Sequence, residues 1–420
     1  MSRKARLSDL SAALIAISVL IFAFRGKIGA IFITMSLVLN ALLLIRSKGK
    51  RSKYNIYAAV FLFLFAFITN CFRSLSPEYY LIIGYLAVVV LLLESSTKYY
   101  DGIWLWLKRI ALFETAGVYL QWLTPGVYYP LVSIFLPDEV VASIRNRLLA
   151  GYYTGFSREV SYTMFLIVVG VGVYVFLENN KKRTIDYVAI AFLFGALLIS
   201  GKRATLLFCV VGIFLTQFIK SRDKLKILKY AFRVAIGITA VWVTYPWWSK
   251  INALSRLTEI IQYISLQDMK GLTNGRTVIY NNAMELWKTN IWFGIGWGNF
   301  KYSVMNNLWY SGFDVHNCFL QVLCETGITG FVFYIFLIII SITNVCRSIH
   351  LIRKGNNLEN TNKAVFCGFI QIFFILYSLT EPILYEYTDY MIFFCCYSST
   401  SMLLREYNTR GKTISKTNAW

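Results

Sequence analysis

The stretch from residue 161 to residue 219 reads SYTMFLIVVGVGVYVFLENNKKRTIDYVAIAFLFGALLISGKRATLLFCVVGIFLTQFI. It contains three apolar runs, at 161–177, 184–200 and 204–219, and short charged segments separate them. Runs of this length approach the ~20 residues that cross the hydrocarbon core of a bilayer as a helix. A backbone in lipid must satisfy its own hydrogen bonds, so we predict that these runs are helices. The pattern indicates an all-α polytopic membrane protein.

The same pattern continues along the whole chain of 420 residues. Hydrophobic residues make up 57% of it and charged residues only 15%, whereas a soluble domain has about a quarter charged residues. We predict about 12 transmembrane helices in a single membrane domain, residues 1–420, and ten to thirteen remain open. The weakest run is the fifth, because Lys108 and Arg109 interrupt it, and a start after them is an alternative. The predicted spans are 7–24, 28–45, 54–72, 79–94, 103–122, 161–177, 184–200, 204–219, 230–246, 316–342, 364–380 and 388–404.

Lysine and arginine cluster in every second connection, which predicts the orientation of the chain. Such clusters mark cytoplasmic loops, so both termini are expected in the cytoplasm. The net charge of +21 is then explained by loops that face an anionic leaflet, and no nucleic-acid partner is expected. The clusters lie within 3–6, 46–53, 181–183, 220–229, 347–363 and 405–416.

Two long loops remain on the opposite, outer face, at residues 123–160 and 247–315. Long loops in compact proteins are usually functional or disordered. The second loop is rich in Trp and Tyr and contains amphipathic helical stretches, so we expect it to be structured.

The short connection Ser200-Gly201-Lys202-Arg203 holds two cations at the outer interface. Snorkelling side chains are one explanation. An outer pair of cations also opposes the positive-inside bias, and a functional role is equally well supported.

In the second outer loop, Gly275-Arg276 opens a helix-like stretch that continues to Thr289. The segment GIGWGNF (294–300) follows it, with Gly296 and Asn299 as candidate binding residues. Alternating glycines permit a close backbone approach, either in an ordinary turn or in a phosphate cradle.

His316-Asn317 lies at the outer mouth of the tenth predicted helix. At 100° per residue, one stripe of this helix contains His316, Leu320, Leu323 and Gly327. Glu325 would then lie on the opposite side and about 13 Å deeper, which disfavours a His–Glu dyad. A glutamate buried in a membrane helix still calls for a partner.

A further group of charges lies in and just after the first outer loop, where a solvated loop is an equally good explanation. Two acidic residues near the eleventh predicted helix, Glu381 and Glu386, fall on the same outer side. The charges of the first loop are Arg145, Arg147, Arg158 and Glu159.

Three segments together resemble the O-antigen ligase and Wzy-type polymerase family of bacterial envelope glycosyltransferases. They are LISGKRATLLF (198–208), GRTVIYNNAMELWKTNIWFGIGWGNF (275–300) and HNCFLQVLCETGITGF (316–331). They are similar to the family's Ser-x-x-Arg stretch, its Gly-Arg helix with GxGxGNF, and its stretch that begins with His-Asn. The motifs cover roughly residues 190–335, and their order and their separation by a large outer loop also match the family.

This resemblance implies a metal-independent, GT-C-like enzyme without cofactors in the bacterial inner membrane, with its active site facing the periplasm. It implies transfer of a glycan from an undecaprenyl-diphosphate lipid to an acceptor hydroxyl. Polymerase is the preferred function; O-antigen ligase, with lipid A-core as acceptor, is the alternative. A lipid-linked oligosaccharide flippase is a second alternative, although transporters place their polar residues near the bilayer midplane. The expected partners are the undecaprenyl-diphosphate-linked glycan donor and acceptor, the membrane lipids and a chain-length regulator.

The matching positions supply the predicted site. Arg203 and Arg276 are expected to stabilise the leaving diphosphate, because a guanidinium is always charged and its fork matches phosphate oxygens. His316 is the expected general base, because it is the only near-neutral candidate on this face. No metal ligands are expected. The expected substrate-binding residues are Lys202, Arg158, Arg145, Arg147, Asn317, Gly296, Asn299 and Glu325.

Overall fold

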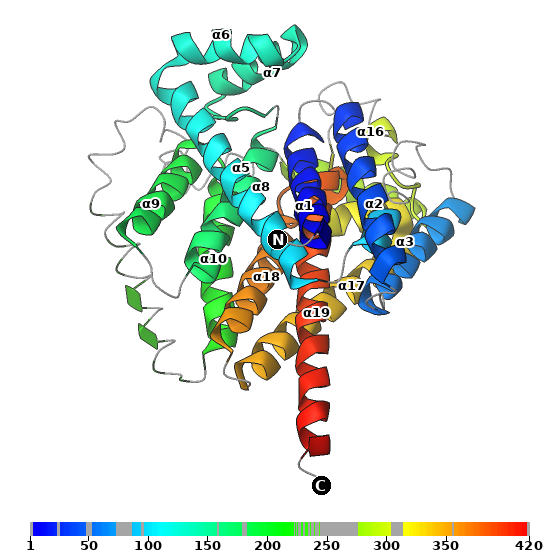
Figure 1. Ribbon diagram of the computed structural model, residues 1–420. Coiled ribbons are helices and arrows are strands. Elements are labelled where there is room, and N and C mark those ends of the chain that lie inside the picture. The colour runs from blue at the N-terminus through cyan, green and yellow to red at the C-terminus, as the bar shows by residue number, and fades with distance from the viewer. Residues whose placement is uncertain are drawn as a thin grey trace.

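The chain forms a bundle of helices in the computed structural model (Figure 1). Every regular element among the described residues is helical. The residues that the structure describes are 3–22, 26–47, 53–72, 86–93, 96–157, 159–178, 183–221, 276–303, 314–354 and 357–417, with isolated positions between 223 and 243.

The helices coincide closely with the predicted apolar runs. Residues 86–92 are helical within the fourth run, and the ninth run falls mostly outside the described residues. The number of membrane-spanning helices therefore stays a prediction. The elements that match the other runs are α1 (Arg3–Phe22), α2 (Gly26–Ser47), α3 (Lys53–Phe72), α5 (Thr97–Leu123), α8 (Val160–Gly172) with a π-helical continuation (Val173–Leu177), α9 (Thr184–Ile199), α10 (Arg203–Lys220), α17 (Cys318–Lys354), α18 (Leu358–Tyr377) and α19 (Tyr387–Thr417).

Three helices of the described part are long and apolar enough to cross a bilayer. They are α8 with its continuation, α10 and α17, and several shorter apolar helices accompany them. Together with the composition, they identify a helical membrane protein.

Helix α5 passes through both Lys108 and Arg109, so the fifth run lies in one continuous helix, and the residue at which its membrane crossing starts stays a prediction. Lys108 is neutralised by an ion pair with Glu178. The guanidinium of Arg109 lies 4.8 Å from the ring centroid of Trp106. An ion pair and a cation–π contact make the two charges compatible with an otherwise apolar helix.

The centre of the bundle is built from helices that are buried on nearly all sides. Almost every residue of α8 and most residues of α18 are buried. A helix that is apolar all round belongs in the interior; α8 has this character, and α18 becomes mostly apolar after its polar first turns. Helix α18 packs against α10, α17 and α19, while α5 packs against α1, α8 and α9.

The first predicted outer loop contains a helical hairpin of α6 (Pro125–Phe135) and α7 (Asp138–Leu149). The hairpin lies beyond the end of the bundle, at the top of Figure 1. After it, the chain returns to α8 along α5, where the Gln121 side chain accepts a hydrogen bond from Thr154 N at 2.8 Å. Tyr153 N donates to Ser200 O at 3.3 Å, which ties the returning segment to the connection between α9 and α10.

The second predicted outer loop contains α15 (Arg276–Thr289) and the short α16 (Phe300–Ser303). Its glycines do approach another backbone closely, and that backbone is α17. A Cβ on Gly294 would lie 2.3 Å from Glu325 C, and a Cβ on Gly327 would lie 2.3 Å from Trp292 C. Both glycines have φ near +65°, and Gly327 interrupts α17. The contact therefore requires glycine on both sides.

Candidate active site

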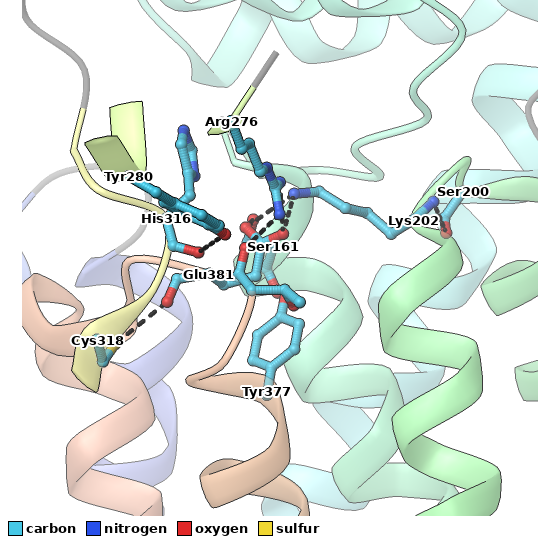
Figure 2. Close-up of polar contacts among 10 residues, drawn as sticks. Ser161, Ser200, Lys202, Arg276, Tyr280, His316, Cys318, Tyr377 and Glu381 are labelled. Carbon is cyan, nitrogen blue, oxygen red and sulfur yellow. Dashed lines mark hydrogen bonds and ion pairs between the residues drawn. The ribbon is translucent and has the colours of Figure 1, made fainter. Parts of the chain in front are cut away.

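The carboxylate of Glu381, in the turn after α18, is the centre of a cluster of charged and polar groups (Figure 2). Lys202 Nζ donates to its two oxygens at 2.8 and 2.9 Å. Arg276 Nη2 lies 3.5 Å from Oε1, and Ser161 Oγ donates to Oε2 at 2.7 Å. Glu381 is only 2% exposed, so these partners replace the water that the carboxylate loses.

Four elements that are distant in sequence supply these groups. Lys202 directly precedes α10, Arg276 is the first residue of α15, and Ser161 lies in the first turn of α8. The backbone of the turn is held independently: Arg276 Nη1 donates to Thr380 O at 2.7 Å, and Cys318 Sγ donates to Glu381 O at 3.1 Å. The ends of five helices, α8, α10, α15, α17 and α18, are thus fixed to one another at this point.

The electrostatics of the cluster favour an ionised glutamate and leave an excess of positive charge. Burial alone would raise the pKa of Glu381, but the charges of Lys202 and Arg276 and the hydrogen bond from Lys202 lower it to about 2. Two cations and one carboxylate give a formal charge of +1. Such a cluster suits an anionic ligand.

His316 lies beside this cluster, and its conformation is unusual (Figure 2). It precedes the first residue of α17 and has φ 55°, so the predicted helical stripe through His316 is wrong. Its carbonyl accepts a hydrogen bond from Tyr280 OH at 3.4 Å. No described residue forms a hydrogen bond with its buried Nδ1 atom.

The pKa of His316 is lowered to about 4. Burial is the largest cause, and the positive charges of Arg276, Lys202 and Arg147 add to it, while Glu381 acts in the opposite direction. The imidazole is therefore neutral at pH 7 and has a lone pair that can accept a proton.

The other predicted cations occupy several places. Arg203 is the first residue of α10 and directly follows Lys202. Arg147 pairs with Glu159 at 2.7 Å, and it is near enough to His316 to lower the pKa of that residue. The guanidinium of Arg145 lies 4.9 Å from the ring centroid of Tyr129, within the α6–α7 hairpin.

The remaining predicted binding residues make contacts within the chain. Asn317 Oδ1 accepts from Leu320 N at 3.0 Å and so caps α17. Gly296 N donates to Glu325 O at 2.8 Å, and Asn299 Nδ2 donates to Ile295 O at 3.1 Å. Their binding role stays a prediction. One predicted binding residue, Arg158, lies outside the described residues, and so does Gly275, which precedes Arg276.

Glu325 has the partners that its burial requires. It accepts hydrogen bonds from Gly298 N at 2.9 Å, from Phe300 N at 3.1 Å and from the hydroxyl of Tyr385. Among the described residues, no hydrogen bond joins Glu325 to His316. The side chain thus fixes the glycine-rich loop onto α17, and its predicted contact with substrate stays a prediction.

Glu381 was missing from the predicted site, although its place near the outer end of the eleventh run was recognised. One signal could have identified it. Two cations are expected near each other on the outer face, and an acidic residue on that face is a natural counter-ion. Ser161 gives no comparable signal, since a serine in the first turn of a membrane helix is ordinary.

Residues 188–335 match the family model described as O-antigen ligase. This range contains Lys202, Arg276 and His316, whereas Ser161 and Glu381 lie outside it. No curated protein matches the chain. The match confirms the resemblance of residues 190–335 to the O-antigen ligase family that their motifs indicate.

Proposed function

From the similarity of this segment to O-antigen ligases, we propose that the chain is a membrane glycosyltransferase that polymerises undecaprenyl-diphosphate-linked oligosaccharide repeat units. The reaction takes place at the outer face of the bacterial inner membrane and yields O-antigen or capsular polysaccharide. One observation carries the proposal: Lys202, Arg276 and His316 come from separate elements and lie around one positively charged site.

The cations would act on the leaving group. As the donor's glycosidic bond breaks, negative charge develops on the undecaprenyl diphosphate. Arg276 and Lys202 would stabilise that charge, and Arg203, the residue after Lys202, would be a further cation for it. The partly buried setting strengthens such interactions, and removal of one well-placed group of this kind costs ~10²–10³ in rate in other enzymes.

His316 would accept the proton of the acceptor hydroxyl. The hydroxyl oxygen attacks the anomeric carbon, the bond to the diphosphate breaks, and the bonding electrons leave with the diphosphate. The proton moves to the neutral imidazole, and the configuration at the anomeric carbon inverts. A bound diphosphate adds negative charge near His316 and so raises its pKa, which makes the imidazole a better base during the reaction.

The glycan banding of a deletion strain tests the proposal. A strain without the gene should make lipid A-core capped with a single repeat unit, and the wild-type gene should restore long chains. The variants Arg276→Ala and His316→Ala should fail to restore them at equal expression. Wild-type chain length in either variant would reject the assigned roles.

A second candidate is the O-antigen ligase activity, which the description of the matching family favours. In that case the acceptor is lipid A-core, and the deletion strain should lose all capping while undecaprenyl-linked polymer accumulates. Donor trapped unprocessed at the cytoplasmic face would reject both transferases and favour a flippase.

A further inference from the structure

We propose that Glu381 is a built-in competitor for the diphosphate group: its carboxylate holds Lys202 and Arg276 before the donor binds and recovers them as the product leaves. The proposal rests on the function proposed above. Glu381 would thus control affinity for the lipid diphosphate and promote product release.

The contacts of the carboxylate are those that an anionic ligand would seek. Lys202 Nζ contacts both oxygens, at 2.8 and 2.9 Å, and Arg276 Nη2 lies 3.5 Å from one of them. A phosphate oxygen is negatively charged, as a carboxylate oxygen is, and it accepts the same charge-assisted hydrogen bonds from Lys202 and Arg276. Glu381 and a diphosphate cannot both satisfy them fully.

The chain can release this carboxylate without losing the local fold. The backbone around Glu381 has separate anchors: Glu381 N donates to Tyr377 O at 3.1 Å, and Glu381 O accepts from Cys318 Sγ. Ser161 Oγ, at 2.7 Å, is a neutral partner that can stay with the carboxylate when the cations turn to another anion. Tyr377 OH donates to Ser161 O at 3.0 Å and ties the two segments together.

The charges indicate why such a competitor is useful. The donor is a diphosphate diester, whereas the product is a monoester with one more ionisable oxygen. Cations that stabilise the leaving group also bind the more highly charged product tightly. A carboxylate beside them repels a bound diphosphate, since like charges a few ångströms apart in a partly buried site interact strongly. It therefore shortens the lifetime of the product complex.

The test measures binding of undecaprenyl diphosphate to the full chain in phosphatidylcholine nanodiscs. The variant Glu381→Gln keeps the size of the side chain and its capacity to accept from Ser161 Oγ, but it removes the charge. We expect this variant to bind undecaprenyl diphosphate at least tenfold more tightly than the wild type. Its multiple-turnover rate should fall more than its single-turnover rate, because product release is the step that Glu381 promotes.

A merely structural role for Glu381 predicts the opposite binding result. Binding that is equal or weaker in Glu381→Gln would overturn the proposal. If that variant does not fold, Glu381→Asp serves instead, because it keeps the charge but withdraws it from Lys202 by one methylene. A smaller tightening is then expected, and unchanged or weaker binding overturns the proposal.

Two controls separate this proposal from the proposed function. If wild-type protein does not bind undecaprenyl diphosphate at all, the transferase function itself fails. If the wild type binds but the variants bind no more tightly, only the competitor role fails. Phosphatidylglycerol in the nanodisc shows whether the site prefers a diphosphate to an ordinary anionic headgroup; equal competition by this lipid would also overturn the proposal.

Discussion

The turn after α18 and the first part of α17 each contain one buried glutamate, and the two glutamates are stabilised differently. Glu381, 2% exposed, is held mainly by the charged side chains of Lys202 and Arg276. Glu325, 1% exposed, is held by the backbone N–H groups of Gly298 and Phe300 and by a tyrosine hydroxyl. Side-chain cations can exchange one anion for another, whereas backbone donors of a folded loop cannot move without unfolding it. The first region is suited to a ligand and the second to structural support.

The largest effect is expected from His316→Asn, beside the Glu381 region. Asparagine tolerates positive φ better than most residues, so the variant keeps the backbone of His316 at φ 55° and removes the imidazole. Loss of a general base typically costs ~10²–10⁴ in rate. Transfer by purified protein should fall by this factor while its thermal unfolding in detergent stays unchanged. A rate within a fewfold of the wild type would contradict the role of His316.

The next effect concerns the Glu325 region and should appear as instability. Glu325→Ala leaves the buried N–H groups of Gly298 and Phe300 without an acceptor, at a cost of about 3 kcal/mol. Thermal unfolding should shift to lower temperature, and activity should fall only in proportion to the protein that unfolds. The control is Glu325→Gln, which keeps one acceptor oxygen and should be less damaging. A stable but inactive Glu325→Ala protein would move Glu325 into the substrate-binding set.

A smaller loss of stability is expected from Gly327→Ala. A Cβ there would lie 2.3 Å from Trp292 C at a φ of +66°, so the loop before α16 must shift away from α17, at about 2 kcal/mol. The matched control is Gly126→Ala in α6, where a Cβ would meet no atom within 4 Å. Alanine should leave that helix as stable as before or stabilise it slightly. Equal tolerance at both positions would show that the close contact does not support the fold.

The smallest effect is expected on the pKa of His316 when Arg276 is replaced. It tests how strongly the charges of the Glu381 region act on a neighbouring side chain. With a pKa of about 4, the imidazole is neutral above pH 4, so the contribution of His316 to kcat/KM should be lost only as the pH falls through about 4. Arg276→Gln removes one positive charge, so the pKa should rise. It should stay below 6.5, because burial, the largest cause, remains.

Imidazole NMR on histidine-labelled protein can follow this titration, because the chain contains only two histidines. His350→Gln identifies the signal of His316. A titration midpoint unaffected by Arg276→Gln would show that Arg276 does not act on His316.

Local features of the fold could be predicted from the sequence. Length and hydropathy were enough to locate most helices, because a backbone in lipid has few alternatives to a helix. The start of the helix at Arg276 and the close backbone approach of the GIGWGNF segment were also predictable, since glycine and helix signals act over a few residues. The α6–α7 hairpin was missed, because the first outer loop was treated as a simple connection between spans.

The site was predictable only in part. Motif positions identified Lys202, Arg276 and His316, but they did not show which acidic residue would pair with the cations, because Lys202 and Arg276 lie about a hundred or more residues from Glu381. Such pairing depends on how α10, α15 and α18 pack, and no short-range pattern encodes it. The helical stripe through His316 failed because Asn317 caps α17, so His316 adopts a positive φ in place of a helical one.

The interruption of α17 at Gly327 bears on how far His316 lies from the hydrocarbon core of the bilayer. From Ile328 to Cys346, before the basic cluster predicted at 347–363, α17 has 19 residues, close to the ~20 that a bilayer crossing needs. The turns from Cys318 to Thr326 are therefore not needed for the crossing, and they can raise His316 by about 13 Å at 1.5 Å per residue. That rise exceeds the thickness of one headgroup layer, which is about 5–8 Å. A long hydrophilic polymer could grow there without entering the hydrocarbon, while the lipid tail of its carrier stays dissolved below.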